Sequence, residues 1–113
     1  MTNKITISPA SGTWVIRAGG AVIAESAKAL ELREGDYPAM IYFPRDDVAM
    51  AFLEATDHST VCPYKGDASY FSIIAKSGPI ENAVWSYEKP IAGIEDIAGY
   101  LAFYPDRTTL EQV

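Results

Sequence analysis

The fold of this 113-residue chain is organised around the stretch His58-Ser59-Thr60-Val61-Cys62-Pro63-Tyr64-Lys65-Gly66-Asp67-Ala68-Ser69-Tyr70. It contains the single histidine and the single cysteine of the chain. Pro63 stiffens the backbone, and Gly66, directly after Lys65, allows a sharp turn or a close approach to a ligand. The stretch ends in apolar residues with strand character. We therefore interpret it as a rigid loop that leads into a core strand.

After this loop the sequence predicts two strands, over residues 68–75 and 83–87, with the turn residues Ser77-Gly78-Pro79 between them. A short helix is predicted over residues 94–98 and a last strand over residues 100–104. The C-terminal half is therefore expected to be rich in β-structure.

Before the loop, the clearest element is a hairpin. Strands are predicted over residues 14–17 and 21–25, and the glycine pair Gly19-Gly20 between them can adopt the positive φ of a tight turn. The other elements expected here are a strand around residues 5–7, a strand or a single helical turn over residues 27–34, and a strand over residues 39–43.

Residues 45–55 are predicted to form the principal helix of the chain. Val48, Phe52 and Ala55 recur at helical spacing. The aspartates at positions 46–47 precede them, where a negative charge favours a helix N-terminus.

These elements amount to about seven short strands and one or two short helices, separated by Gly and Pro turns. Such a pattern predicts a single domain, residues 1–113, that is mainly β and antiparallel. Hydrophobic residues make up 49% and charged residues 21% of the chain, as in ordinary globular proteins.

Composition excludes several classes of function. The net charge of −6 opposes binding to nucleic acid, which depends on Lys and Arg. One cysteine cannot form an internal disulfide or a multi-cysteine zinc site. The sequence shows no signal peptide and no apolar run of membrane-spanning length. A cytoplasmic protein without membrane or nucleic-acid partners is expected.

Four stretches of the sequence have a family-like character: Tyr42-Phe43-Pro44-Arg45-Asp46-Asp47-Val48, Cys62 to Tyr70, Trp85-Ser86-Tyr87 with Pro90, and Leu101-Ala102-Phe103-Tyr104-Pro105. Together they resemble domain-of-unknown-function family 427, which is sometimes labelled nucleotidyltransferase-like. The resemblance covers roughly residues 14–105, and the Cys-Pro-Tyr-Lys-Gly block is its most specific part.

The resemblance implies a mainly β fold of tent-like or barrel-like antiparallel sheets, similar to methionine sulfoxide reductase B and the Mss4 proteins. Those relatives usually carry paired Cys-x-x-Cys zinc ligands, which this chain lacks, so no metal or other cofactor is predicted. The nucleotidyltransferase label gains no support, because the chain has no Gly-Ser motif followed by paired aspartates.

One functional hypothesis is catalysis by Cys62. A cysteine attacks as its thiolate, which a neighbouring cation or base favours. Lys65 and His58 lie within four residues, and Asp57 or Asp67 could orient the imidazole. The alternative is that Cys62 is a small buried side chain and that His58 lies on the surface.

A second hypothesis is a binding pocket formed by the loop at Cys62–Gly66 and the strand at Trp85. Trp85 and Tyr87 fall on one face of that strand, with Tyr70 on a neighbouring strand and Tyr64 and Lys65 at the rim. Aromatic residues so placed form either core or a stacking surface for a planar group.

We rank binding of a small polar or aromatic molecule first, and an enzyme that uses Cys62 or Lys65 second. A purely structural interaction module is the fallback. Sheet edges in a small β-domain need protection, so a homo-oligomer is compatible with the sequence.

Overall fold

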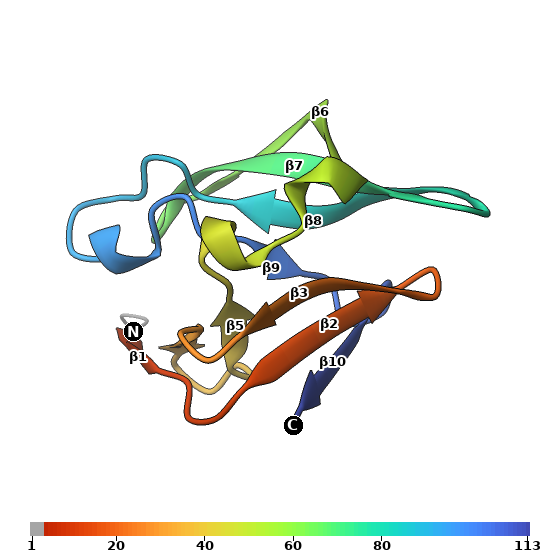
Figure 1. The fold of residues 1–113 in the computed structure, drawn as a ribbon. Helices are drawn as coiled ribbons and strands as arrows, with labels where there is room; N and C mark the ends of the chain where they lie inside the picture. Colours follow the sequence, from red (N-terminus) through yellow and green to blue (C-terminus); the bar gives the residue numbers. More distant parts are fainter. Residues whose placement is uncertain (1–3) are drawn as a thin grey trace.

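Short apolar and alternating segments form ten strands in the computed structural model, which describes residues 4–113 (Figure 1). The strands are β1 (Ile5–Pro9), β2 (Trp14–Ala18), β3 (Ala21–Ser26), β4 (Leu30–Glu34), β5 (Met40–Tyr42), β6 (Leu53–Cys62), β7 (Gly66–Ala75), β8 (Gly78–Ser86), β9 (Ala102–Phe103) and β10 (Thr109–Gln112). Three single-turn 3-10 helices are η1 (Arg45–Asp47), η2 (Met50–Phe52) and η3 (Glu95–Ile97).

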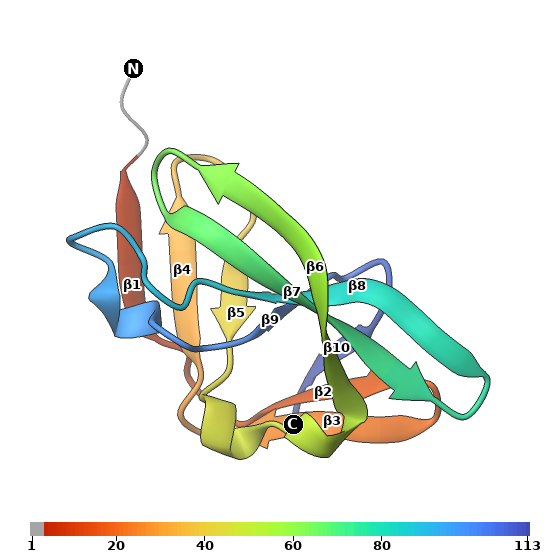
Figure 2. The same ribbon diagram turned by 90° about the horizontal axis from the view of Figure 1, so that it is seen from above.

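The strands assemble into three antiparallel sheets, with orders β1-β4-β5, β10-β2-β3 and β6-β7-β8-β9. Figure 1 shows the four-stranded sheet as an upper layer above β2, β3 and β10, and Figure 2 shows β1, β4 and β5 beside it. The mainly β, antiparallel prediction is confirmed. The sheets do not close into a barrel, so the tent-like arrangement describes the fold and the barrel-like one does not.

Two of the sheets are joined through a pair of residues. Phe43, directly after β5, and Leu101, directly before β9, exchange backbone hydrogen bonds of 2.8 and 2.9 Å. Both residues are fully buried. This bridge holds the β1-β4-β5 sheet against the end of the four-stranded sheet.

The central strands β7 and β8 of the four-stranded sheet contribute to a core on each of its faces, because consecutive residues of a strand point to opposite sides. Phe71 and Val84 face a core shared with the β2–β3 hairpin. Tyr70 and Trp85 face a second core shared with β4 and β5. The apolar runs of β7 and β8 therefore serve two cores at once.

The helix predicted over residues 45–55 is wrong. Val48 lies between η1 and η2 in an extended conformation and forms a β-bridge with Ala24. The next amide, Ala49 N–H, donates to the carbonyl of Ile23 at 2.8 Å. Pairing with the edge of β3 thus outweighs the helical spacing of the apolar residues.

The loop interpretation of the stretch that begins at His58 is also wrong over residues 58–62, because these residues belong to β6. They are mostly exposed because β6 is the edge of its sheet. The helix predicted over residues 94–98 is the single turn η3, and β10 was not predicted at all. The hairpin at Gly19-Gly20 is confirmed, and of residues 27–34, predicted as a strand or a helical turn, the part Leu30–Glu34 is strand β4.

Among residues 4–113, no helix has the length and apolar character needed to cross a membrane.

Candidate functional site

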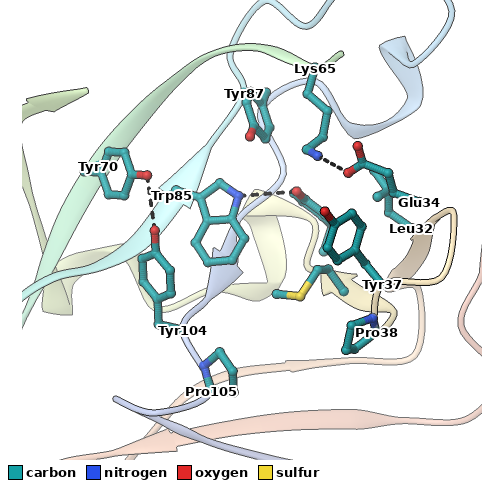
Figure 3. Close-up of a pocket in the computed structure, with 12 residues that line it drawn as sticks. Leu32, Glu34, Tyr37, Pro38, Lys65, Tyr70, Trp85, Tyr87, Tyr104 and Pro105 are labelled. Atoms are coloured by element: carbon teal, nitrogen blue, oxygen red, sulfur yellow. Dashed lines mark hydrogen bonds and ion pairs between the residues drawn. The ribbon is translucent and has the colours of Figure 1, made fainter. Parts of the chain in front are cut away.

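A cavity of about 410 Å³ lies where the β1-β4-β5 sheet meets the four-stranded sheet (Figure 3). Its walls come from β4, β5, β7 and β8, from the turn after β6, and from the segments that follow β4, β8 and β9. The lining residues are Leu32, Glu34, Tyr37, Pro38, Met40, Tyr42, Lys65, Tyr70, Trp85, Tyr87, Tyr104 and Pro105.

Trp85 is the centre of the aromatic wall. Its ring centroid lies 4.6 Å from that of Tyr104 and 6.3 Å from that of Tyr42, which it meets edge-on. Its indole Nε1–H donates to the Tyr42 hydroxyl at 3.3 Å. These contacts leave the indole with one orientation, in which it lines the cavity (Figure 3).

A short chain of hydroxyls holds the neighbouring rings. The Tyr70 and Tyr104 hydroxyls lie 3.2 Å apart, and the Thr60 hydroxyl on β6 lies 2.9 Å from that of Tyr70. The Tyr70 and Tyr104 rings are nearly parallel, with an interplanar angle of 14°. The edge strand β6 thereby helps to orient Tyr104 in the cavity wall.

The polar end of the cavity is an ion pair between Lys65 and Glu34. Lys65 Nζ donates to Glu34 Oε1 at 2.5 Å, and the two side chains are only 15% and 13% exposed. The pair connects the β6–β7 turn to the end of β4 (Figure 3).

The backbone of the β6–β7 turn sets the position of Lys65. Its carbonyl accepts a hydrogen bond from Ile91 N–H at 3.0 Å. Gly66 has a φ of +114°, and a Cβ there would lie 3.4 Å from the carbonyl oxygen of Lys89. Glycine therefore lets the turn bend sharply against residues 89–91.

Burial raises the pKa of three tyrosines in the cavity wall. It raises the pKa of Tyr42 to about 12, against the opposing effect of the hydrogen bond from Trp85. Burial, together with the hydrogen bond to Tyr70, raises the pKa of Tyr104 to about 12. Burial also places the pKa of Tyr87 well above its ordinary value. These three hydroxyls therefore stay protonated near neutral pH and do not act as acids or bases there.

The structure brings together four of the five residues that the sequence proposed for binding, namely Lys65, Tyr70, Trp85 and Tyr87. Tyr70 and Trp85 are direct cross-strand partners. Tyr64 is not in the cavity lining, and it is 43% exposed.

The candidate catalytic residues Cys62 and His58 lie apart. Cys62 is half-buried, packs against the second core and is not in the cavity lining. His58 is exposed, and its ring meets that of Tyr70 edge-on, with 4.4 Å between the ring centroids. Four residues of extended strand separate their Cα atoms by about 13 Å. Within residues 4–113, no hydrogen bond joins them.

Asp57 and His58 instead line a separate, shallower hollow with Glu54 and Glu81. Within the part of the chain that the structure describes, no group of three or more His, Cys, Asp or Glu residues could hold a metal ion.

Several lining residues were not proposed from the sequence. Glu34 was one of many acidic residues, and no spacing rule paired it with Lys65, 31 positions away. Tyr42 and Tyr104 belong to stretches that carried the family resemblance, which was the available signal. Tyr37 lies at the rim and is 66% exposed, and no feature of the sequence pointed to it.

The model of a protein family described as "Domain of unknown function (DUF427)" matches residues 6–113. The chain belongs to this family. The match extends past both ends of residues 14–105, the region over which the sequence resembles the family. Among curated proteins, no match was found. The DUF427 description assigns no activity, so the function must be argued from the site.

The four stretches that resemble DUF427 all contribute to the cavity wall. Tyr42 comes from the first, Lys65 and Tyr70 from the second, Trp85 and Tyr87 from the third, and Tyr104 with Pro105 from the fourth. Segments that are distant along the chain thus meet at one place.

Proposed function

We propose that this DUF427 protein binds a small molecule in the cavity at Trp85 and Lys65. The observation that carries the proposal is the convergence of all four family-resembling stretches on one aromatic-walled cavity with a half-buried ion pair at its end. Ligand sites are commonly apolar, aromatic and of 300–1,000 Å³, with a few placed polar groups. The cavity volume of about 410 Å³ falls in that range.

The ligand is expected to carry a planar ring and one polar group. The ring lies against Trp85 and Tyr104, because offset or tilted aromatic contacts contribute about 0.5–1.5 kcal/mol beyond burial. The polar group lies at Lys65. We place this activity in the cytoplasm, where a half-buried free thiol such as Cys62 stays reduced.

The two tryptophans of the chain provide the test. Trp85 lines the cavity, whereas the Trp14 indole donates to the carbonyl of Ser11 in another part of the fold. A library of aromatic metabolites is screened by following both indole N–H signals in ¹H–¹⁵N spectra, assigned with Trp14→Phe. A ligand is expected to shift the Trp85 signal and leave the Trp14 signal in place.

Two exposed tyrosines give matched variants. Tyr37→Ala removes a ring from the rim of the cavity, and Tyr64→Ala removes one that is not in its lining. Ligands should raise the Tm of the Tyr64 variant as much as that of the native protein, and that of the Tyr37 variant less. If no compound moves the Trp85 signal, or if Trp14 responds equally, the proposal fails.

A further inference from the structure

We infer that the ligand enters the cavity with an uncharged polar group that accepts hydrogen bonds, such as the carbonyl of an aromatic amide, lactam or quinone. This inference rests on the proposed binding function and narrows the chemical class of the ligand. It follows from the charges and the hydrogen-bond donors that line the cavity.

The charged side chains in the cavity lining, Lys65 and Glu34, compensate each other. They are joined at 2.5 Å, and both are nearly buried. A carboxylate ligand would either take Lys65 from Glu34 or bring a second negative charge to the same ammonium. A cationic ligand would either take Glu34 from Lys65 or bring a second positive charge to the same carboxylate. In both cases a nearly buried ion pair would gain a further charge that it does not compensate, which is costly away from water.

Two polar groups of the cavity wall can donate hydrogen bonds to a ligand. The Lys65 ammonium carries three N–H groups, of which Glu34 accepts one. The Tyr87 hydroxyl makes no hydrogen bond with other residues in the range 4–113, and Tyr87, like Lys65, lines the cavity (Figure 3). The indole N–H of Trp85 is already used by Tyr42. An acceptor on the ligand can therefore pair with Lys65 and Tyr87 while the ion pair stays closed.

The test uses three probes with the same two-ring body: 2-naphthamide, 2-naphthoate and 2-naphthylmethylammonium. Each is titrated at neutral pH against the Trp85 indole signal, with the Trp14 signal as internal reference. The neutral amide is expected to bind about tenfold or more tightly than either charged probe, a factor that corresponds to about 1.4 kcal/mol. Tighter binding of the carboxylate or the ammonium probe would overturn the inference.

Variants of the ion pair make the role of charge explicit. Glu34→Gln leaves the charge of Lys65 without its partner, so the preference should move to the carboxylate probe by about tenfold. Lys65→Gln removes the positive charge, so the preference should move to the ammonium probe. The double variant restores neutrality and should again prefer the amide.

The matched control is Glu31→Gln. Glu31 also lies on β4 and pairs with Arg33, but it is not in the cavity lining. This variant should keep the selectivity of the native protein. Retention of the amide preference in Glu34→Gln would overturn the charge argument.

The outcomes separate this inference from the function on which it rests. If neither the three probes nor any compound of the aromatic library moves the Trp85 signal, the proposed function and the inference both fail. If a library compound moves this signal and the amide probe does not, the proposed function stands and the inference alone fails. If a charged probe binds best, the proposed function stands and the inference alone fails.

Discussion

At the scale of single residues, the site depends on hydroxyl groups that burial keeps neutral. Tyr42 is 1% exposed and accepts the indole hydrogen bond of Trp85, and Tyr104 is stacked against Tyr70. Burial disfavours the tyrosinate, so both hydroxyls hold their protons more tightly in the folded chain than in the unfolded one.

This difference predicts a loss of stability at alkaline pH. Unfolded tyrosines ionise near pH 10, whereas the pKa of Tyr42 and that of Tyr104 are about 12 in the fold. Between these values the folded state binds more protons, so the free energy of unfolding falls as pH rises, by up to about 1.4 kcal/mol per pH unit for each tyrosine. The contribution is complete below pH 10 and is lost as pH rises through 12. Urea unfolding from about pH 9 to about pH 11 measures the slope.

Tyr42→Phe isolates one of these groups. The variant loses the hydroxyl that accepts from Trp85, so its stability also changes at neutral pH. The diagnostic quantity is therefore the slope with pH, which should be shallower than that of the native protein by about one tyrosine's share. Equal slopes would show that Tyr42 ionises alike in both states.

At the scale of elements, the turn of the β2–β3 hairpin packs against the end of β7. Gly19 and Gly20 have φ values of +57° and +81°. A Cβ on Gly19 would lie 2.5 Å from the Cβ of Ala75, at the end of β7, whereas a Cβ on Gly20 would meet nothing within 4 Å. The two glycines share a backbone requirement but differ in packing.

We therefore expect Gly19→Ala to destabilise the protein more than Gly20→Ala. Both variants place an alanine at positive φ, which costs about 1 kcal/mol. Gly19→Ala adds an overpacking cost of about 1–3 kcal/mol against Ala75. Chemical denaturation measures both losses. Adding Ala75→Gly should recover most of the difference, and equal losses in the two single variants would contradict the contact.

At the scale of the whole molecule, the cavity exists because two sheets meet. The Phe43–Leu101 bridge joins them, and the cavity residues come from both sides of this junction. A rigid junction keeps Trp85 and the Lys65–Glu34 pair at a constant separation, and a preorganised site binds with less loss of entropy.

Hydrogen exchange should reveal that rigidity. The amides of Phe43 and Leu101 are buried and mutually bonded, so they should exchange as slowly as the amides of the central strand β7. The amides of β10, an exposed edge strand, should exchange much faster. NMR-detected exchange measures all three groups in one experiment. Exchange at Phe43 and Leu101 as fast as in β10 would mean that the sheets separate independently.

Most of the cavity residues proposed from the sequence were predicted correctly, but the contacts between them were not predicted. Lys65, Tyr70, Trp85 and Tyr87 were proposed from local chemistry, and they do line one cavity. Glu34 could not be assigned, because an ion pair across 31 positions leaves no periodic trace in the sequence. Tyr64 directly precedes Lys65, yet its side chain is exposed and is not in the lining.

The sequence alone determined the class of fold, the Gly19-Gly20 hairpin and the family, because strand alternation and glycine turns are local properties of the chain. Tertiary structure decided which apolar segments became strands. Val48 has helical spacing in the sequence but forms a bridge with Ala24, and residues 58–62, interpreted as a loop, belong to β6. It also decided the site, since the distance between Lys65 and Glu34 depends on how two sheets pack. Contacts between distant segments form only when burial of both cores offsets the loss of chain entropy, and local sequence patterns do not encode that balance.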